Sequence, residues 1–312
     1  MNALPLAFYE SLCAQFDVAD CGVFKTLCTE NPKYRALKAA IDQLVFVGLR
    51  VDGFNGTWSY WMQKTTNPVA WANPANPSLQ GFNILFTKRN VQITFDQLKE
   101  MDRRHVHVYC VELADRGATS EYHESSFGEI LEIMKFTAPC ANLADLCVQC
   151  SQLTGDVVSR ILSFYKNSPF KNIETTALGR SFEEFIESQL SLKRLEKLLL
   201  TGHGWSQEFH SQIENYALSS PFPSFRLGEL EFSKEFFVRL LKEAVVVNKS
   251  LFVAHFLFDF EELEDLERME TIKYLEIASF GKNIVWRRED GVRITATGTP
   301  NSFQIEIQLE RC

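Results

Sequence analysis

The chain has 312 residues, of which 46% are hydrophobic, and it contains 26 Phe but only 10 Pro. This composition predicts a folded protein and argues against a disordered one. The formal net charge is −8 and no long run of Lys or Arg occurs. Because phosphate binding needs a clustered basic patch, we expect no nucleic-acid partner.

Targeting signals are not evident in the sequence. Residues 1–16 lack the basic start of a secretory signal and carry Glu10 within their apolar stretch. Apolar runs such as 251–258 are shorter than the roughly 18 residues that a membrane span needs, so no membrane contact is expected. The eight cysteines show no disulfide-like spacing, which predicts reduced thiols in the cytoplasm or nucleus.

The first 38 residues predict a helical segment, because Leu4, Phe8, Leu12 and Phe16 fall four apart along one helix face. Residues 41–112 are rich in predicted strands. The strand candidates are 44–51, 58–62, 82–86, 91–95 and 106–111, with a turn at Asp52-Gly53 and a loop over 67–78.

A spaced apolar triplet recurs through the second half, in the form apolar, two residues, apolar, one residue, apolar. The copies are Leu143/Leu146/Val148, Phe170/Ile173/Thr175, Leu195/Leu198/Leu200, Leu227/Leu230/Phe232 and Ile272/Leu275/Ile277, with a weaker one at Leu251/Ala254/Phe256. Their starts advance by 27, 25, 32, 24 and 21 residues. Leucine-rich-type repeats have a period of about 20–29 residues, so the pattern indicates an array of this type.

Helical patterns follow the triplets, and each opens near a capping residue. The expected capping residues are Asp156, Ser181 (in a capping box with Glu184), Ser206 and Ser233. Repeated strand–helix units imply right-handed crossovers and a parallel sheet. Residues 284–287, 292–296 and 303–309 alternate apolar and polar residues, which predicts an antiparallel meander that covers the last open edge of the array.

The predicted fold class is therefore α/β, an irregular leucine-rich-type βα repeat array with a helical N-terminal segment and a C-terminal antiparallel β cap. The expected domains are a helical segment over 1–38, a strand-rich start and repeats over 39–280, and a β-meander cap over 281–312.

Candidate catalytic and metal-binding residues are few. Cys147 and Cys150 form a CxxC, but the second ligand pair of a structural zinc site is missing at a sensible spacing. His105 and His107 lie on one face of a predicted strand and could begin a metal site, although solvent-facing histidines are the commoner case. No nucleotide-binding, nucleophile-elbow or kinase motif occurs. We expect neither enzymatic activity, nor a metal, nor a cofactor.

The N-terminus carries a family resemblance. Leu4-Pro5, then Phe8, Leu12 and Phe16, then Asp20, Val23 and Leu27-Cys28 resemble an F-box of the lineage-expanded nematode F-box-like families with leucine-rich-like repeats. The specific match covers about the first 30 residues. It departs from the pattern after Cys28, where the expected aromatic residue is missing and Asn31-Pro32 interrupts the tail.

The resemblance implies a substrate-binding adaptor of a cullin-type ubiquitin ligase. Leu4, Pro5, Phe8, Leu12 and Phe16 would dock on a Skp-type adaptor protein as a helix in a groove, and the remainder would select a protein substrate. The alternative is a protein-interaction scaffold with no ligase link, in which the N-terminal helix only caps the array.

The repeat also predicts which residues face the partner, because side chains on a strand alternate between its two faces. The outward positions expected to bind the partner are Asp145, Gln149, Glu174, Lys197, Thr201, Glu229, Glu231, Tyr274 and Glu276. Cys147 and Leu199 fall in the same outward register. Since this set is mostly acidic, we expect a basic protein partner.

Overall fold

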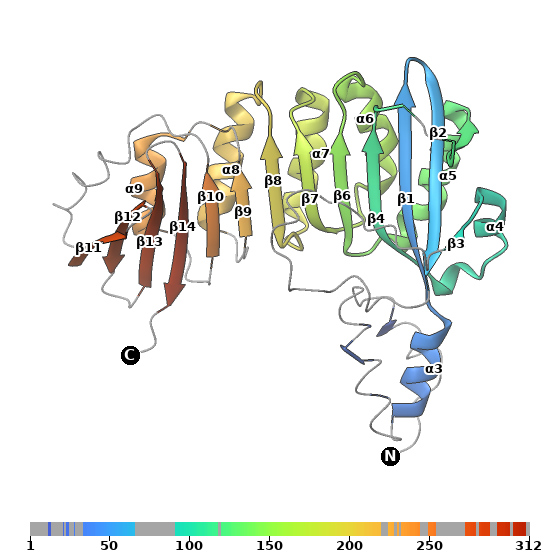
Figure 1. Cartoon of the computed structure of the whole chain (residues 1–312), viewed down its shortest axis with the longest axis horizontal. Coiled ribbons are helices and arrows are strands. Elements are labelled where there is room, and N and C mark those ends of the chain that lie inside the picture. The colour runs from blue at the N-terminus through green and yellow to red at the C-terminus, as the bar shows by residue number, and fades with distance from the viewer. Residues whose placement is uncertain are drawn as a thin grey trace. The chain divides into compact units, whose positions relative to one another are not determined.

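The computed structural model describes residues 12–13, 21, 23–24, 28, 34–65, 91–117, 120–219, 224–227, 230, 232–243, 249–253, 272–278, 281–287, 292–299 and 302–309. The chain divides into two compact units, Met1–Lys171 and Asn172–Cys312, called unit 1 and unit 2 below. Figure 1 labels helices and strands of both units. Within these described ranges, no helix is both long and apolar enough to cross a membrane.

Unit 1 is a mixed sheet with helices. Its elements are α3 (Arg35–Gln43), β1 (Val45–Phe54), β2 (Thr57–Thr65), β3 (Val91–Gln92), α4 (Phe95–Lys99), η3 (Arg103–His105), β4 (Val106–Ala114), β5 (His123–Ser125), α5 (Phe127–Thr137), η4 (Ala138–Cys140), β6 (Ala144–Gln149), α6 (Gly155–Leu162) and η5 (Ser163–Tyr165). The strand order is β3-β2-β1-β4-β6, and β5 also pairs with β2. The central strands β1, β4 and β6 are parallel, whereas β2 runs antiparallel to β1 and β3.

The hairpin between β1 and β2 turns at Asn55-Gly56, so the turn predicted at Asp52-Gly53 is wrong. Asn55 and Gly56 both have positive φ, 50° and 79°, as a two-residue type I′ turn requires. Asp52 instead lies inside β1, where its side chain is buried. A Cβ on Gly53 would lie 2.6 Å from the Trp58 ring, so this glycine permits close packing within the hairpin.

Unit 2 continues the strand–helix alternation and ends in antiparallel strands. Its elements are β7 (Phe170–Thr176, which begins just before the boundary), α7 (Arg180–Ser191), β8 (Lys197–Thr201), α8 (Gln207–Ser219), β9 (Ser224–Leu227), α9 (Lys234–Glu243), β10 (Lys249–Val253), β11 (Ile272–Ala278), β12 (Gly281–Arg287), β13 (Val292–Thr299) and β14 (Ser302–Leu309). Strands β7 to β10 are parallel neighbours. The predicted antiparallel meander is confirmed, and its last strand, β14, pairs with the edge of β10.

The mixed α/β class and its mainly parallel central strands are thus confirmed, but two of the apolar triplets lie elsewhere than predicted. Ile173, Leu198 and Phe225 are direct neighbours across β7, β8 and β9, so Phe225 takes the place expected for Leu230. Leu230 follows β9 and is fully buried, outside the ladder. Leu275 belongs to β11, which pairs antiparallel with β12 instead of extending the parallel strands.

The fourth triplet is displaced from its strand because residues of the connection before helix α9 pack into the core. Phe232 is buried and its ring lies 4.8 Å from that of Phe236 and 6.5 Å from that of His210. Leu230 and Phe232 are therefore core residues of a connection, which share the triplet spacing without being in a strand. Strand β9 therefore begins at Ser224, three residues before Leu227, where the triplet starts.

Two of the four expected helix caps are confirmed. The hydroxyls of Ser206 and Ser233 accept the backbone N–H groups of Phe209 and Phe236, at 3.2 and 3.1 Å. Helix α7 instead begins after Gly179, so Ser181 lies inside the helix and forms no cap. Likewise, Thr154 takes the N-cap position expected for Asp156.

The described N-terminal residues pack on the body of unit 1. Cys13, Cys21 and Cys28 are buried in one apolar cluster with residues of α3 and the start of β1, including Leu37 and Phe46. Leu12 is helical and half-buried. The other residues of the expected docking set, namely Leu4, Pro5, Phe8 and Phe16, lie outside the described residues, as do the loop expected over 67–78 and the strand expected over 82–86.

Candidate functional site

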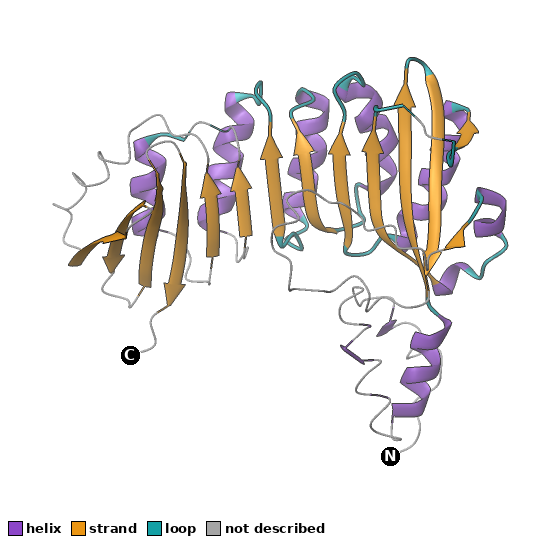
Figure 2. Ribbon diagram, viewed as in Figure 1, coloured by secondary structure: helices purple, strands orange, loops and turns teal. Residues whose placement is uncertain are grey.

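The two faces of the unit 1 sheet differ in chemistry. On one face, the ring centre of Trp58 in β2 lies 4.9 Å from that of Phe127 in α5. Buried apolar residues such as Val51 and Leu113 lie on this same face of the sheet. Figure 2 shows helices α5 and α6 on one side of these strands. Since side chains alternate along a strand, the intervening residues point to the other face.

That other face, called the polar face below, is built from four neighbouring strands. Its members, row by row across β2, β1, β4 and β6, are Gln63, Gly48, Cys110 and Asp145, then Trp61, Arg50, Glu112 and Cys147, then Ser59, Asp52, Ala114 and Gln149. Most of these residues are buried, whereas Trp61, Arg50, Asp145 and Gln149 are only half-buried. The pairing of β1 with β4 is irregular next to Gly48, and the absence of a Cβ at Gly48 leaves room for the Tyr109 ring.

Arg50 lies at the centre of the polar face. Its Nε is 3.5 Å from Oε1 of Glu112, and the two side chains are 20% and 7% exposed. The ring of Tyr122, from the connection before β5, lies 5.6 Å from the guanidinium carbon. Trp61 is the direct cross-strand neighbour of Arg50 on β2. A cation thus lies beside a carboxylate and one aromatic ring, with a second aromatic residue opposite it across the strand pair, an arrangement suited to binding another molecule by hydrogen bonds and flat contact.

Two buried carboxylates at the ends of the strands have a different role. Oxygens of Asp52 accept the backbone N–H groups of Arg116 and Gly117, at 3.3 and 3.1 Å. One oxygen of Asp115 accepts three successive N–H groups, from residues 151 to 153. These carboxylates hold the loops that follow β4 and β6, and their acceptor positions are occupied by the chain itself.

The cysteines of this region are unsuited to nucleophilic or metal chemistry. Burial, together with the nearby carboxylates of Asp115, Asp52 and Glu112, raises the pKa of Cys150 to about 12. Burial also raises the pKa of Cys110 well above its usual value. A neutral thiol is a poor nucleophile and a poor metal ligand. Among the described residues, no group of three His, Cys, Asp or Glu side chains is placed to hold a metal ion.

The two histidines expected on one strand face are separated by a change of backbone conformation. His105 ends the short helix η3, and its Nδ1 lies 3.8 Å from Oδ2 of Asp102. His107 belongs to β4 and is buried, with its ring 5.6 Å from that of Phe46. The interpretation that both histidines face solvent on one strand is therefore wrong.

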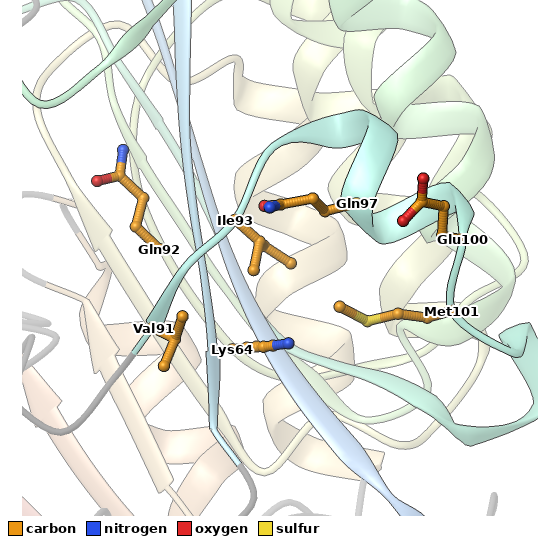
Figure 3. Close-up of a pocket in the computed structure, with 7 residues that line it drawn as sticks. All are labelled: Lys64, Val91, Gln92, Ile93, Gln97, Glu100 and Met101. Carbon is orange, nitrogen blue, oxygen red and sulfur yellow. The ribbon is translucent and has the colours of Figure 1, made fainter.

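A separate cavity of about 320 Å³ lies between β2, β3 and α4 (Figure 3). Its lining residues are Lys64, Val91, Gln92, Ile93, Gln97, Glu100 and Met101. The amide of Gln97 is held by the backbone N–H of Thr94, and the amide of Gln92 donates to the carbonyl of Glu121. This leaves Lys64 and Glu100 as the ionisable groups of the lining, which supply no pairing of nucleophile and base.

The sequence-predicted partner residues fall in both units. Asp145 and Gln149 belong to the polar face of unit 1, where the Gln149 amide oxygen accepts from Arg116. Glu174, Lys197 and Thr201 are half-buried positions of β7 and β8 in unit 2. Tyr274 and Glu276 lie on the antiparallel strand β11, and Glu229 and Glu231 lie outside the described residues.

Two members of the predicted outward register are buried, contrary to expectation. Cys147 and Leu199 are 1% and 8% exposed. The side chains of Cys147 and Leu199 are therefore not available to a partner.

Arg50, Glu112 and Tyr122 were not predicted from the sequence. Two signals pointed to the first two. Glu112 is a charged residue within the otherwise apolar strand Val106–Ala114, and Arg50 and Asp52 alternate with apolar residues in Val45–Phe54. Tyr122 is far from Arg50 in the sequence, and the two side chains come together only when the chain folds, so no local pattern indicates their contact.

Comparison with protein-family models, with curated proteins and with solved structures found no match to this chain.

Proposed function

We propose that this chain is a non-enzymatic protein-recognition subunit and that the polar face of unit 1 binds a segment of its partner. The observation that carries the proposal is the grouping of Arg50, Trp61 and Tyr122 on a strand face opposite the helices. Arg, Trp and Tyr are the residue types that most often dominate the binding energy of protein interfaces.

Charge favours a basic partner. The polar face carries Asp52, Glu112 and Asp145 against Arg50, and the whole chain has a net charge of −8. In unit 2, the half-buried positions expected to bind the partner include one acid, Glu174, and one base, Lys197. Complementary potential raises the association rate of a basic segment and disfavours acidic ones.

The proposal extends to the βα units, which we assign to an irregular leucine-rich type. The parallel pairing of β7, β8 and β9, with α7 and α8 as the connections, supports this assignment. Arrays of this kind use the strand side as an extended binding surface.

The proposal also includes the ligase link that the N-terminal resemblance implies, with Leu4, Pro5, Phe8, Leu12 and Phe16 docking on a Skp-type adaptor. Such an adaptor subunit acts in the cytoplasm or nucleus, where thiols stay reduced, and the described cysteines are buried. The competing function is a scaffold without a ligase. The packing of Cys13, Cys21 and Cys28 on the unit 1 core favours it, because that contact fixes part of the N-terminal segment to the body.

Binding of the full-length chain to a purified Skp-type adaptor protein, measured by calorimetry, separates the two functions. The ligase link predicts binding that the substitutions Phe8→Asp and Leu12→Asp abolish. Tyr34→Asp is the control, because Tyr34 is 48% exposed and lies outside the docking set. If the unsubstituted chain does not bind the Skp-type adaptor, the ligase link is wrong and the scaffold function remains.

Recognition by the polar face is tested with two pools of short fluorescent peptides, one rich in Lys and Arg and a matched one rich in Asp and Glu. We expect the full-length chain to prefer the basic pool, and Asp145→Lys to weaken that binding. Asp156→Lys, at an exposed position of α6, is the control. Equal binding of both pools, or of neither, contradicts recognition of a basic segment.

A further inference from the structure

We infer that Arg50 is the anchor of this surface and that its guanidinium donates hydrogen bonds to main-chain carbonyl oxygens of an extended basic segment. The inference rests on the proposed recognition function and names the chemistry by which the partner is held.

The first support is the set of contacts that Arg50 makes. Within the described part of the chain, Arg50 forms an ion pair with Glu112 and a ring contact with Tyr122. Its Nε is buried and has no hydrogen-bond partner. A guanidinium carries five N–H donors, and buried polar groups in folded proteins are normally hydrogen-bonded. The Nε–H of Arg50 is therefore a buried donor with no acceptor among the described residues, and the 20% of the side chain that stays exposed is the part that another molecule can reach.

The second support is the charge around Arg50, which decides between a carboxylate and a neutral acceptor. Glu112 already lies 3.5 Å from Nε, and Asp52 follows two residues later on the same face of β1. Asp145 lies one row away, next to Cys110. A further carboxylate would enter a site with three acidic side chains around Arg50, and the second nearby cation, Arg116, is already bonded to Gln149, so like-charge repulsion opposes it. A carbonyl oxygen accepts from Arg50 without that repulsion, and basic side chains of the same segment match the acidic surroundings.

The third support is the shape of the group. The Tyr122 ring lies over the guanidinium, and Trp61 stands opposite Arg50 across the β1–β2 pair, where directly opposed side chains are about 5 Å apart. Trp61 and Tyr122 are both half-buried, so each keeps part of its ring accessible. Two flat side chains beside a fork of donors suit an extended main chain, which presents carbonyl oxygens at regular intervals.

The test uses the full-length chain and the tightest-binding single peptide selected from the basic pool. Arg50→Lys keeps the charge but loses the planar fork, and we expect it to weaken binding about tenfold. The matched control is Arg160→Lys, because Arg160 also lies over an aromatic ring, 5.3 Å from that of Phe127, but on the helix side of the sheet. Arg160→Lys is expected to leave binding unchanged.

Carbonyl recognition is tested by replacing single peptide bonds of that peptide with thioamides, whose sulfur is a weaker acceptor. At one or two positions the replacement should weaken binding to the unsubstituted chain but not to Arg50→Lys, since the two changes remove the same hydrogen bond. Thermal melting of each variant shows whether it is folded. Where Arg50→Lys is unstable, Tyr122→Leu takes its place, because it removes the ring and leaves the ion pair.

The outcomes separate the two proposals. If the unsubstituted chain binds no basic peptide, recognition of a basic segment is wrong and the role of Arg50 fails with it. If the chain binds but Arg50→Lys, or its replacement Tyr122→Leu, binds equally well, recognition stands and the Arg50 anchor is refuted. Weakened binding without coupling to any thioamide refutes the carbonyl contact, and tighter binding of the acidic pool refutes the basic partner.

Discussion

Both oxygens of the Glu183 carboxylate accept hydrogen bonds from Ser206, one from its backbone N–H at 2.7 Å and one from its hydroxyl at 2.6 Å. The Ser206 hydroxyl also accepts the N–H of Phe209, so a buried carboxylate on α7 fixes the residue that caps α8. Asp52 and Asp115 hold the loops after β4 and β6 in a similar way. In three places, a buried acid joins one strand–helix unit to the loop of the next.

Replacement of Glu183 by Ala should lower the free energy of unfolding by about 2–3 kcal/mol, because it leaves the N–H and hydroxyl of Ser206 without their charged acceptor. Urea unfolding followed by circular dichroism measures the change. Glu184→Ala is the control, since Glu184 is 64% exposed and lies 3.7 Å from the same Arg180 that contacts Glu183. A similar loss in both variants would contradict a specific role for the buried carboxylate.

Replacement of Asp115 by Ala should release the loop after β6. Three N–H groups, those of Ser151, Gln152 and Leu153, lose their common acceptor, while the side chains of Ser151 and Gln152 are already exposed to water. Hydrogen exchange of these amides should therefore accelerate by about tenfold or more, since local opening no longer breaks charge-assisted bonds.

The control for that experiment is Asp156→Ala, because Asp156 is exposed in the first turn of the adjacent helix α6. Unchanged exchange at residues 151–153 in the Asp115 variant would show that water or another group replaces the carboxylate without loss.

The sequence predicts the parallel strands well where the apolar spacing coincides with a strand that is buried on its helix-facing side. Ile173 and Leu198 have this property, and they pair as expected. The prediction fails at Leu230 because apolar spacing reports burial, and a buried connection is indistinguishable from a strand by spacing alone. The hairpin turn was misplaced for a related reason, since Asp-Gly and Asn-Gly are both turn signals and only packing against Trp58 separates them.

The candidate site could be predicted only in part. Alternation along a strand identifies Asp145 and Gln149 as outward residues, and both belong to the polar face. The burial of Cys147 between them is not encoded locally, because it depends on what covers the face. The contact of Tyr122 with Arg50 joins residues 72 positions apart, and no local period relates such positions.

Alanine at Gly56 and at Gly128 should have opposite effects on stability. Gly56 has φ of +79°, so Gly56→Ala forces a side chain into the left-handed region and should cost about 1 kcal/mol. Gly128 lies in α5, where a Cβ meets only ordinary contact at 3.7 Å. Gly128→Ala should therefore raise the free energy of unfolding by about 0.5–1 kcal/mol. Denaturant unfolding of both variants checks the signs, and a loss in both would contradict the turn assigned to Asn55-Gly56.

The alkaline reactivity of Cys150 should report the burial of its thiol and the carboxylates near it. Burial raises the pKa of Cys150 from 9.0 to about 12, with Asp115 as the largest charged contributor. At pH 9 about half of an ordinary thiol is ionised but only about a thousandth of Cys150, so its alkylation by iodoacetamide should be roughly five hundredfold slower in the folded chain. Because the thiol of Cys150 ionises less readily in the folded chain than in the unfolded one, its contribution to the free energy of unfolding is fully present below pH 9. This contribution falls as the pH rises toward 12.

Mass spectrometry of the labelled peptide measures the rate, and the chain in denaturant supplies the unperturbed reference. Asp115→Asn removes the nearby charge while keeping the side-chain shape, so it should lower the pKa of Cys150 and speed the reaction at pH 9. Asp156→Asn should leave the rate unchanged, because Asp156 is exposed on α6 and is not among the groups that shift this pKa. Rapid labelling of the unsubstituted folded chain would show that Cys150 is open to solvent, which would contradict its burial.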